Sequence, residues 1–423
     1  MILIVYNVNC DAMRIALMHH SPLRDIDNAT PRNFLGIANI LKRKGIEIEI
    51  FVLSDRNATS NFSGYKQHEV KGFIYPNNKS VLKLIEFSAL VILNKRPLMW
   101  LMNKTNRLIE EIDNYNPDVI IIGDFVLSDM LKRYKERKYN KAKIISLMDS
   151  QETFYSNLNA IMNSRIPFRR IIRDVLKRNY IGWDHKMFRN MAKLSSAVVT
   201  SSNEGKNEIL KGFPEFKNKI VAISPYYVSK IKEKPKPRNR IAKILFIGSY
   251  THGPNIEAIE NIRSIIAPKL TDKTFVICGK GCPQKKEGNI DYRGTVPDLS
   301  KLMNEVDICI SPITTGGGRK AKVFEYLAAG KVVLGTPVSF TGYSAKNNVN
   351  ALIEKGIERF ADRIRDLDSN PKLFKTIQKN VFSAIKTESE TEVKRAWFKT
   401  LNKILNSDFE HGGSSNPAQC HAS

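Results

Sequence analysis

The stretch DICISPITTGGGRKAKVFEYLAAGKVVLG, residues 307–335, contains one complete strand–helix–strand unit. Residues 307–312 form an apolar, β-branched run that predicts a buried strand. Residues 320–329 are predicted as a helix, and the valine-rich run 331–335 as the next strand. A strand, a helix and a strand in this order make the βαβ unit of a parallel sheet.

The alternation of strands and helices continues in both directions from this stretch. Such alternation indicates an α/β protein with doubly wound parallel sheets. The further strands expected from apolar runs cover residues 14–18, 46–53, 118–124, 143–149, 197–202, 220–223, 243–248 and 275–279.

A break in composition divides the chain into two domains. Residues 230–240, KIKEKPKPRNR, are dense in Lys and Pro, which is typical of a stiff, charged linker. Residues 386–406 are expected to form a C-terminal helix that could pack back on the first domain. The expected organisation is an N-terminal extension (1–12), a first Rossmann-like domain (13–229), a linker (230–242), a second Rossmann-like domain (243–385), the C-terminal helix (386–406) and a disordered, Gly/Ser-rich tail (407–423).

The composition is that of an ordinary folded protein, but the charge is not balanced. Of 423 residues, 42% are hydrophobic and 26% are charged, which excludes a wholly disordered, collagenous or membrane-channel chain. The chain has 67 Lys and Arg against 42 Asp and Glu, a net charge of +25. This excess favours an anionic partner, which could be nucleic acid, an acidic membrane face or a phosphorylated substrate.

The cysteines and the apolar segments bear on the compartment. The five cysteines are scattered and odd in number, so a reducing compartment fits better than a disulfide framework. Cys278 and Cys282 lack a His or a second cysteine pair to complete a metal site, and we interpret them as small apolar residues at strand ends. The N-terminal run has no basic leader, and the apolar stretch 81–101 is interrupted by charges. We therefore expect a cytoplasmic protein, either soluble or peripheral on the inner face of the cell membrane.

Three consecutive glycines connect the strand 307–312 to the following helix. Gly316, Gly317 and Gly318 permit close approach of the backbone to a ligand. The helix that begins near Arg319 offers free N–H groups and a positive potential, which suit a phosphate group. Arg319 and Lys322 add cationic side chains beside that helix start.

Glu325 lies in the otherwise apolar helical run VFEYLAAG. A carboxylate that faces an apolar interior needs hydrogen-bond partners, and the vicinal hydroxyls of a ribose would supply them. The alternative is that the glycines form only a flexible turn and that Glu325 pairs with Lys322 on the surface, because glycine-rich loops before helices are common.

The segment 311–335 resembles the donor-site motif of the retaining GT-B glycosyltransferases often called group 1 or family 4. In that motif a glycine-rich loop and a basic residue precede a Glu in a helix, followed by Ala, Gly, Lys and a valine-rich strand. Residues 246–255 resemble the opening of that family's second domain, 291–299 its loop near the nucleotide base, and 13–20 the first strand of its acceptor domain. The resemblance covers residues 13–405 and is strongest over 243–340.

The resemblance implies a GT-B architecture, in which two Rossmann-like domains face a cleft and the second domain binds a nucleotide-sugar donor. The sugar would pass, with retention of configuration, to a hydroxyl group of a glycan, a lipid-linked or a small-molecule acceptor, in polysaccharide or glycolipid synthesis. Arg319 and Lys322 would neutralise the leaving diphosphate and Glu325 would hold the ribose, so no metal or other cofactor is expected. The donor-binding residues implied in this way are Gly248, Gly294, Val296, Gly316, Gly317, Gly318, Arg319, Lys322 and Glu325.

The chain departs from the family pattern at several positions. Gly317 occupies the position where the family often has an earlier Glu, and residues 249–251 replace an Arg and a Lys. Gly123 stands where a His often ends a strand of the first domain. Phosphate contact is therefore expected to depend more heavily on Arg319 and Lys322, and a catalytically silent nucleotide-sugar-binding protein is one alternative.

Polar residues at strand ends are the candidates for catalysis in the first domain. His19 and His20 end the first expected strand, and Asp124 and Asp149 end two later ones. His19, Asp124 and Asp149 could orient the acceptor hydroxyl or the sugar. The alternative for each is a plain structural role, since His is often partly buried and Asp is favoured in turns.

The segment 165–193 interleaves basic and apolar residues at helical spacing. Such a pattern is typical of a helix on an anionic bilayer, or of a domain helix with a solvated basic side. A nucleic-acid partner is not expected, because no recognition helix, zinc finger or aromatic RNA-binding signature is visible. A nucleotide-sugar epimerase on the same fold is the remaining alternative among enzymes.

Overall fold

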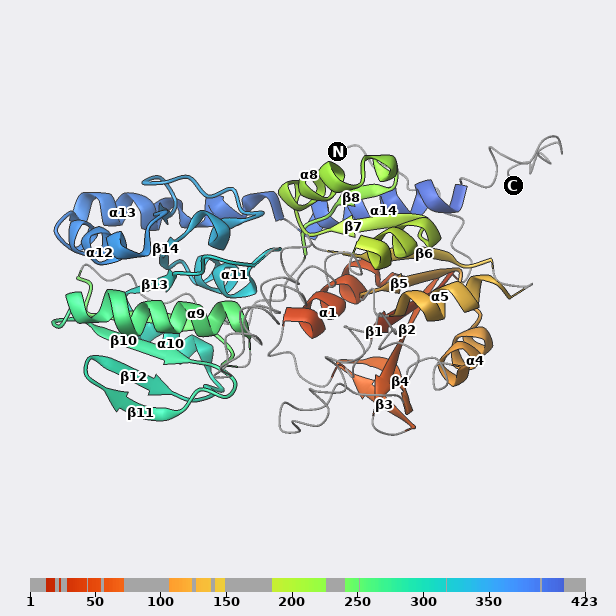
Figure 1. Cartoon of the computed structure of the whole chain (residues 1–423), viewed down its shortest axis with the longest axis horizontal. Helices are drawn as coiled ribbons and strands as arrows, with labels where there is room; N and C mark the ends of the chain where they lie inside the picture. The colour runs from red at the N-terminus through yellow and green to blue at the C-terminus, as the bar shows by residue number, and fades with distance from the viewer. Residues whose placement is uncertain are drawn as a thin grey trace, which may run out of the picture.

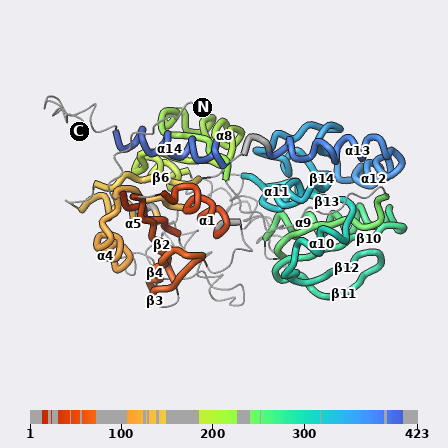
Figure 2. The backbone as a smooth tube through the Cα atoms, turned by 180° about the vertical axis from the view of Figure 1, so that it is seen from behind, coloured from red at the N-terminus to blue at the C-terminus, as the bar shows by residue number. Residues whose placement is uncertain are grey.

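The structure is a computed structural model in which two α/β domains lie side by side along the longest axis (Figures 1 and 2). The first domain contains the N-terminal half of the chain, and the second domain follows residue 240. The residues that the structure describes are 13–19, 23, 29–43, 45–54, 57–71, 106–123, 127–137, 141–148, 185–225, 240–250, 252–316, 318–388 and 390–406.

The first domain is built on a sheet whose strand order, over the described residues, is β3-β4-β2-β1-β5-β6-β7-β8. The strand β1 pairs in parallel with both β2 and β5, so the order of the sheet reverses at β1. The strands are β1 Met13–His19, β2 Ile46–Ser54, β3 Ala58–Phe62, β4 Tyr65–Lys71, β5 Val119–Ile122, β6 Lys143–Leu147, β7 Ala197–Thr200 and β8 Ile220–Ala222. The helices are α1 Ala29–Leu41, α4 Asn106–Tyr115, α5 Ser128–Lys135 and α8 Asn203–Gly212, and residues 185–194 are also helical.

The second domain repeats this plan with the strand order β11-β12-β10-β9-β13-β14-β15 among its described residues. Its order reverses at β9, which lies between β10 and β13. The strands are β9 Lys243–Ile247, β10 Thr274–Cys278, β11 Gln284–Glu287, β12 Ile290–Arg293, β13 Ile308–Ser311, β14 Val332–Gly335 and β15 Leu352–Ile353. The helices are α9 Gly253–Asn261, α10 Leu299–Glu305, α11 Ala321–Ala328, α12 Phe360–Asp368 and α13 Pro371–Asn380, and α14 Glu390–Asn406 follows the second domain. Shorter helical turns cover Pro214–Phe216, Ile262–Ile266, Ala267–Lys269, Pro337–Phe340, Ile357–Arg359 and Val381–Glu388.

The central strands are buried on both faces, which explains their continuous apolar sequences. In β1, Leu17 packs into one core layer of the first domain, while the neighbouring Met18 packs into the layer on the other face. In β9, Ile244 and Leu245 divide in the same way between the two layers of the second domain. The doubly wound α/β fold expected from the sequence is therefore confirmed.

Both sheets are parallel in their central strands, as expected, and antiparallel at one edge. An antiparallel hairpin, β3 with β4 or β11 with β12, forms one edge of each sheet. These strands are polar, and buried residues alternate with more accessible ones in β12 and in most of β4, so their sequences lack the apolar runs of central strands. Residues 291–299, which resemble a loop, begin inside β12.

The C-terminal helix α14 returns to the first domain (Figure 2). Its side chains Trp397, Phe398 and Leu401 are buried in the same core layer as Ile37 of α1. The chain therefore crosses between the two domains twice, once on either side of the second domain. None of the helices in the described part of the chain is long and apolar enough to span a membrane. The stretch 81–101 and most of the basic segment 165–193 lie outside the described residues.

Candidate active site

The candidate site lies where the strand order of the second sheet reverses. The chain leaves β9 at Gly248 and β13 at Pro312, at the carboxyl edge of the sheet, and then enters α9 and α11. In open α/β sheets ligands bind outside the carboxyl ends of the strands at such a reversal. The glycine loop and the start of α11 are therefore placed where the fold favours a ligand.

The glycine loop takes a backbone conformation that favours glycine. Gly316 has a φ of 108° and Gly318 a φ of 67°, both in the left-handed region. The Nζ of Lys320 donates hydrogen bonds to the carbonyl oxygens of Gly316, at 3.0 Å, and of Gly318, at 2.8 Å. This lysine therefore ties the loop to the start of α11. Gly317 lies outside the described residues.

The loop is also held from the side of α9. The hydroxyl groups of Thr314 and Thr315 both donate to the carboxylate of Glu257, which lies on α9, and the Thr315 distance is 2.8 Å. The glycine loop is thus fixed before its glycines by Glu257 and after them by Lys320. Neither Glu257 nor Lys320 was predicted as a site residue. The sequence feature that could have indicated a carboxylate partner for the loop is the pair of adjacent threonines before the glycines.

Arg319 is buried at the end of the glycine loop. Its guanidinium lies over the ring of Tyr343, 4.0 Å from the ring centroid. The Tyr343 hydroxyl donates to the carbonyl oxygen of Lys320 at 2.8 Å. Arg319 is therefore positioned by an aromatic platform beside the first turn of α11.

Lys322 connects the first turns of α11 and α9. Its Nζ donates to the side-chain oxygen of Asn255 and lies 4.3 Å from the centroid of the Phe246 ring. The Asn255 amide in turn donates to the Ser249 carbonyl oxygen at 3.1 Å. Burial, and then the positive charge of Lys320, lower the pKa of Lys322 to about 7.

His252 is a site candidate that sequence reasoning missed. It directly precedes α9 and its side chain keeps contact with solvent, but desolvation of the ring, followed by the positive charges of Lys322 and Lys320, lowers its pKa to about 4. At pH 7 its imidazole is therefore neutral, so one ring nitrogen can donate a hydrogen bond. A histidine immediately before a Gly–Pro helix start is the signal in the sequence.

Glu325 is buried and forms an ion pair with the first domain. Its carboxylate accepts a hydrogen bond from the guanidinium of Arg32 on α1, and the two side chains are 3% and 7% exposed. The alternative of a surface pair between Glu325 and Lys322 is therefore wrong. Arg32 was not predicted, because it lies 293 residues away in the sequence and belongs to the other domain.

The other predicted donor residues gather at the same edge of the sheet. The N–H of Gly248 donates to the carbonyl oxygen of Cys278 at 2.9 Å. The N–H of Gly279 donates to the carbonyl oxygen of Gly294 at 2.8 Å. Val296 is partly buried against the core layer that contains Tyr326. Gly248, Gly294 and Val296 thus line up along the strand ends that lead into the site.

The first domain contributes His19 beside α1. His19 is buried at the end of β1, and its ring contacts that of Phe34 edge to face, with centroids 5.5 Å apart. Gly123 follows β5, and the Phe34 ring occupies the place where a side chain at Gly123 would lie. His20, Asp124 and Asp149 lie outside the described residues.

The cysteines of the second domain are buried, and Cys278 ends strand β10, as predicted. Cys278, Cys282 and Cys309 are free and buried, and burial raises the pKa of the Cys278 thiol to about 12. In the part of the chain that the structure describes, no three His, Cys, Asp or Glu side chains come together to hold a metal ion.

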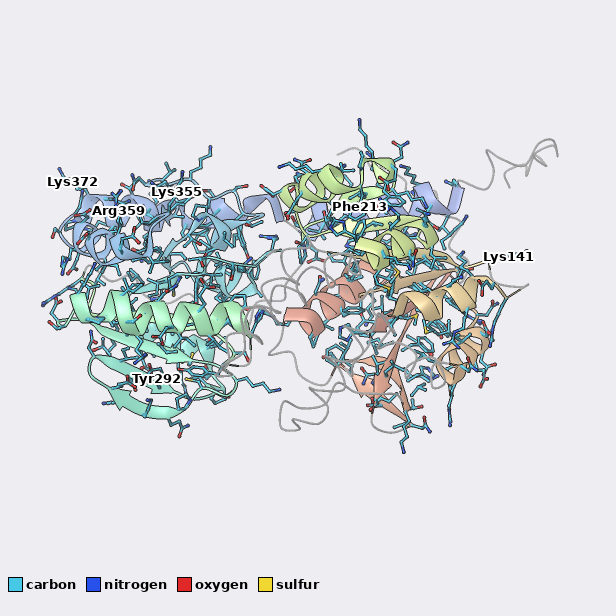
Figure 3. All side chains as sticks on the ribbon, in the orientation of Figure 1. Lys141, Phe213, Tyr292, Lys355, Arg359 and Lys372 are labelled. Carbon is cyan, nitrogen blue, oxygen red and sulfur yellow. The ribbon has the colours of Figure 1, made fainter. Side chains whose placement is uncertain are left out.

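Basic residues also lie far from the candidate site. Figure 3 labels Lys355, Arg359 and Lys372 on the second domain and Lys141 at the opposite end of the molecule, on the first domain. The positive charge of the chain is therefore spread over both domains, so the site alone does not account for it.

The comparisons with known proteins agree with this geometry. Residues 242–370 match the family model "Glycosyl transferases group 1". A search of curated protein sequences finds no match to the chain. Among solved structures, TarM has a TM-score of 0.64 and 12% identity and covers 93% of this chain and 100% of its own.

Two further structures are similar in the same way. Sucrose-phosphate synthase from Thermosynechococcus elongatus has a TM-score of 0.62 and 11% identity, and covers 95% of this chain and 100% of its own. A variant of S. aureus TarM, in complex with fondaparinux, alpha-GlcNAc-glycerol and UDP, has a TM-score of 0.62 and 13% identity. The match covers 92% of this chain and 100% of the TarM chain. At such low identity these similarities show the fold alone. Residues 242–370 thus match a group 1 glycosyl transferase domain, and the chain as a whole has the two-domain GT-B fold.

Proposed function

We propose that the protein moves a sugar from a nucleotide-sugar donor, bound by the second domain, to a hydroxyl group of an acceptor. The observation that carries this proposal is the meeting of two helix starts at the glycine loop. Lys322 in the first turn of α11 bonds Asn255 in the first turn of α9, and Lys320 and His252 lie beside them. Two helix N-termini and several cations converge there, and a diphosphate is the group that such a site favours.

The chemistry requires that the charge of the leaving group is met in place. During transfer the bond between the sugar and the diphosphate breaks, a bond to the acceptor oxygen forms, and the acceptor hydroxyl loses its proton. Negative charge then develops on the diphosphate oxygen. Preorganised donors at this position lower the barrier because they need little reorganisation during the reaction. Lys322, Arg319 and the N–H groups of the glycine loop would supply these donors.

Lys322 is suited to respond to the donor. Its pKa of about 7 means that it is only partly charged in the free protein at neutral pH. An anion beside it favours the charged form and raises the pKa. Donor binding would therefore complete the protonation of Lys322 and strengthen its contact with the diphosphate. We extend this to a metal-independent reaction, in which these side chains take the place of a divalent cation.

The donor and the acceptor are proposed by class. The S. aureus TarM variant contains UDP, which makes a UDP-sugar the first donor to test. Glu325 would hold the ribose of that donor. The acceptor would be a glycan, a lipid-linked or a small molecule, and the configuration at the sugar would be retained, as the resemblance implies. Sedimentation with and without anionic vesicles tests whether the acceptor is reached at a membrane surface.

A thermal-shift screen over UDP-, GDP-, ADP- and dTDP-sugars tests the donor proposal, because a ligand that binds only the folded state raises the apparent stability of the protein.

Two variants test the site. Glu325→Ala and Lys322→Ala should each weaken donor binding and lower the turnover number. Full transfer rates in both folded variants would refute the assignment of the site. Incubation with the donor alone separates transfer from an epimerase, because an epimerase would form a product without an acceptor.

A further inference from the structure

The ion pair between Arg32 and Glu325 occupies the carboxylate that the donor would use. The pair joins α1 of the first domain to α11 of the second. The Glu325 side chain is 3% exposed and that of Arg32 is 7% exposed, so solvent scarcely reaches either group. A ribose hydroxyl must come within hydrogen-bond distance of the carboxylate, and it competes there with the guanidinium, which already donates to the Oε1 atom of Glu325.

The position of Arg32 is fixed by the packing of α1. Phe34, half a turn further along this helix, contacts the ring of His19 and fills the space beside Gly123. These two residues end β1 and follow β5, the strands at which the first sheet reverses. The helix also packs against α14 through buried residues such as Ile37 and Leu401. Arg32 is therefore presented to the second domain by a rigid support.

A second contact joins the domains near the same helix start. A Cβ atom on Gly342 of the second domain would lie 3.0 Å from the Cβ of Ser202, which caps α8 in the first domain. The same Cβ would lie 2.6 Å from the Cγ of Arg319. Among the described residues, the two domains thus approach each other at Gly342 beside Arg319 as well as at the Arg32–Glu325 pair.

We propose that the Arg32–Glu325 pair is a latch that holds the two domains together in the absence of donor and that a nucleotide must open in order to bind. This inference rests on the proposed function, because it takes Glu325 as the ribose-binding residue. Taking two charges out of water is costly, and the mutual attraction of Arg32 and Glu325 offsets part of that cost. Exchange of Arg32 for two ribose hydroxyls at Glu325 returns the guanidinium to water and keeps the carboxylate partnered.

The latch makes a prediction that distinguishes it from a donor-binding arginine. When the binding-competent state is only a fraction of the population, the apparent dissociation constant is raised by the inverse of that fraction. Removing the arginine should therefore tighten nucleotide binding. An arginine that contacts the diphosphate would have the opposite effect, because its removal would weaken binding.

The test measures UDP affinity by calorimetry and the radius of gyration by solution scattering, on Arg32→Met, Arg32→Lys and wild type. Methionine keeps the apolar bulk of the side chain, and Arg32→Lys keeps the charge if Arg32→Met does not fold. We expect Arg32→Met to bind UDP about 3- to 30-fold more tightly and to be more extended without ligand, with Arg32→Lys between it and wild type. Arg14→Ala removes an arginine from an exposed Arg–Glu pair of the same domain, 45% and 57% exposed, and should change neither quantity.

Each outcome decides the proposal. Weaker or unchanged UDP binding by a folded Arg32→Met variant overturns the latch and leaves the proposed function intact. UDP binding by Arg32→Met but not by wild type supports it. If no protein, including Arg32→Met, binds UDP, GDP, ADP or dTDP, the proposed function itself fails and the latch fails with it. The charge-swapped variant Arg32→Glu with Glu325→Arg should restore the compact shape but not UDP binding, and a swap that binds UDP as wild type does contradicts the role of Glu325.

Discussion

Lys322 and Asn255 are hydrogen bonded across the start of two helices that follow different strands of the second sheet. The contact brings the N-terminus of α11 against the N-terminus of α9 and points a lysine amine at an amide oxygen over the Phe246 ring. An amine in these surroundings is partly desolvated, and its pKa falls to about 7. Lys322 thus connects the two helix starts and is also a titratable cation of the site.

Replacing Lys322 should separate these two functions. Lys322→Met removes the donor to the diphosphate, and we expect the dissociation constant of the nucleotide sugar to rise about 10- to 100-fold, as the loss of a charge-assisted hydrogen bond implies. The free energy of unfolding at pH 7 should not fall, because the variant no longer buries an amine. Calorimetric titration and chemical denaturation measure the two quantities.

Lys301→Met is the matched control, since the Lys301 side chain is 84% exposed on α10. It should leave both the affinity and the stability unchanged. A Lys322→Met variant that binds the nucleotide sugar as wild type does would show that Lys322 only joins the two helices.

Donor binding should take up a proton above pH 7. The free protein has a lowered Lys322 pKa of about 7, whereas the ordinary value is 10.5, and the diphosphate raises it again on binding. Below pH 7 Lys322 is already charged, so affinity should not depend on this group. Above pH 7 the amine of the free protein is neutral, and affinity should fall as pH rises, by up to about tenfold per pH unit.

The proton is measured by calorimetry at pH 8 in Tris and in HEPES, whose ionisation enthalpies differ. A nucleotide sugar is the right probe because its diphosphate is esterified at both ends and does not titrate in this range. Lys322→Met should abolish the dependence on buffer. Equal binding enthalpies in the two buffers for wild type would contradict the protonation of Lys322 by the donor.

The sequence predicted the central strands and the glycine loop because their signals are local. β-Branched runs mark strands buried on both faces, and Gly316 and Gly318 are glycines where φ is positive. The edge hairpins were missed because β3, β4 and β11 are short and polar. These patterns resemble surface loops until a neighbouring strand is present.

The partners of the charged residues could not be predicted in the same way. The Arg32–Glu325 pair depends on how two domains meet, and the lowered pKa of Lys322 depends on burial by residues from several loops. The motif in 311–335 identified Arg319, Lys322 and Glu325 as candidates, but not Glu257, which fixes the loop between the strand and the glycines.

Glu257 should control the order of the glycine loop. Glu257→Ala removes the acceptor for the Thr314 and Thr315 hydroxyls, so the loop must be ordered by the donor at the time of binding. Misplacement of positioning groups lowers the turnover number, and we expect a loss of about tenfold or more. Glu257→Gln keeps an oxygen acceptor and should recover part of the activity.

Glu260→Ala, one turn further along α9, is the control. Glu260 pairs with Arg263 at 2.8 Å on the surface, and the two side chains are 55% and 48% exposed. Removal of an exposed pair of this kind has little effect on stability because water screens it, and the turnover number should stay at the wild-type value. A Glu257→Ala variant with full turnover would mean that Lys320 alone orders the loop.

Gly342 lies between Arg319 and the first domain, and a side chain there should disturb both. Its φ is +79°, and a Cβ atom would lie 2.6 Å from the Cγ of Arg319 and 3.0 Å from the Cβ of Ser202. Gly342→Ala therefore carries backbone strain of about 1 kcal/mol and also forces Arg319 away from the Tyr343 ring.

Gly64→Ala is the control that separates backbone strain from the displacement of Arg319, because Gly64 has a φ of +91° and no atom within 4 Å of the added Cβ. Both variants should lose similar stability from strain, but only Gly342→Ala should bind the nucleotide sugar more weakly, by several-fold in calorimetry. Equal affinities in the two variants would show that the position of Arg319 does not matter for the donor.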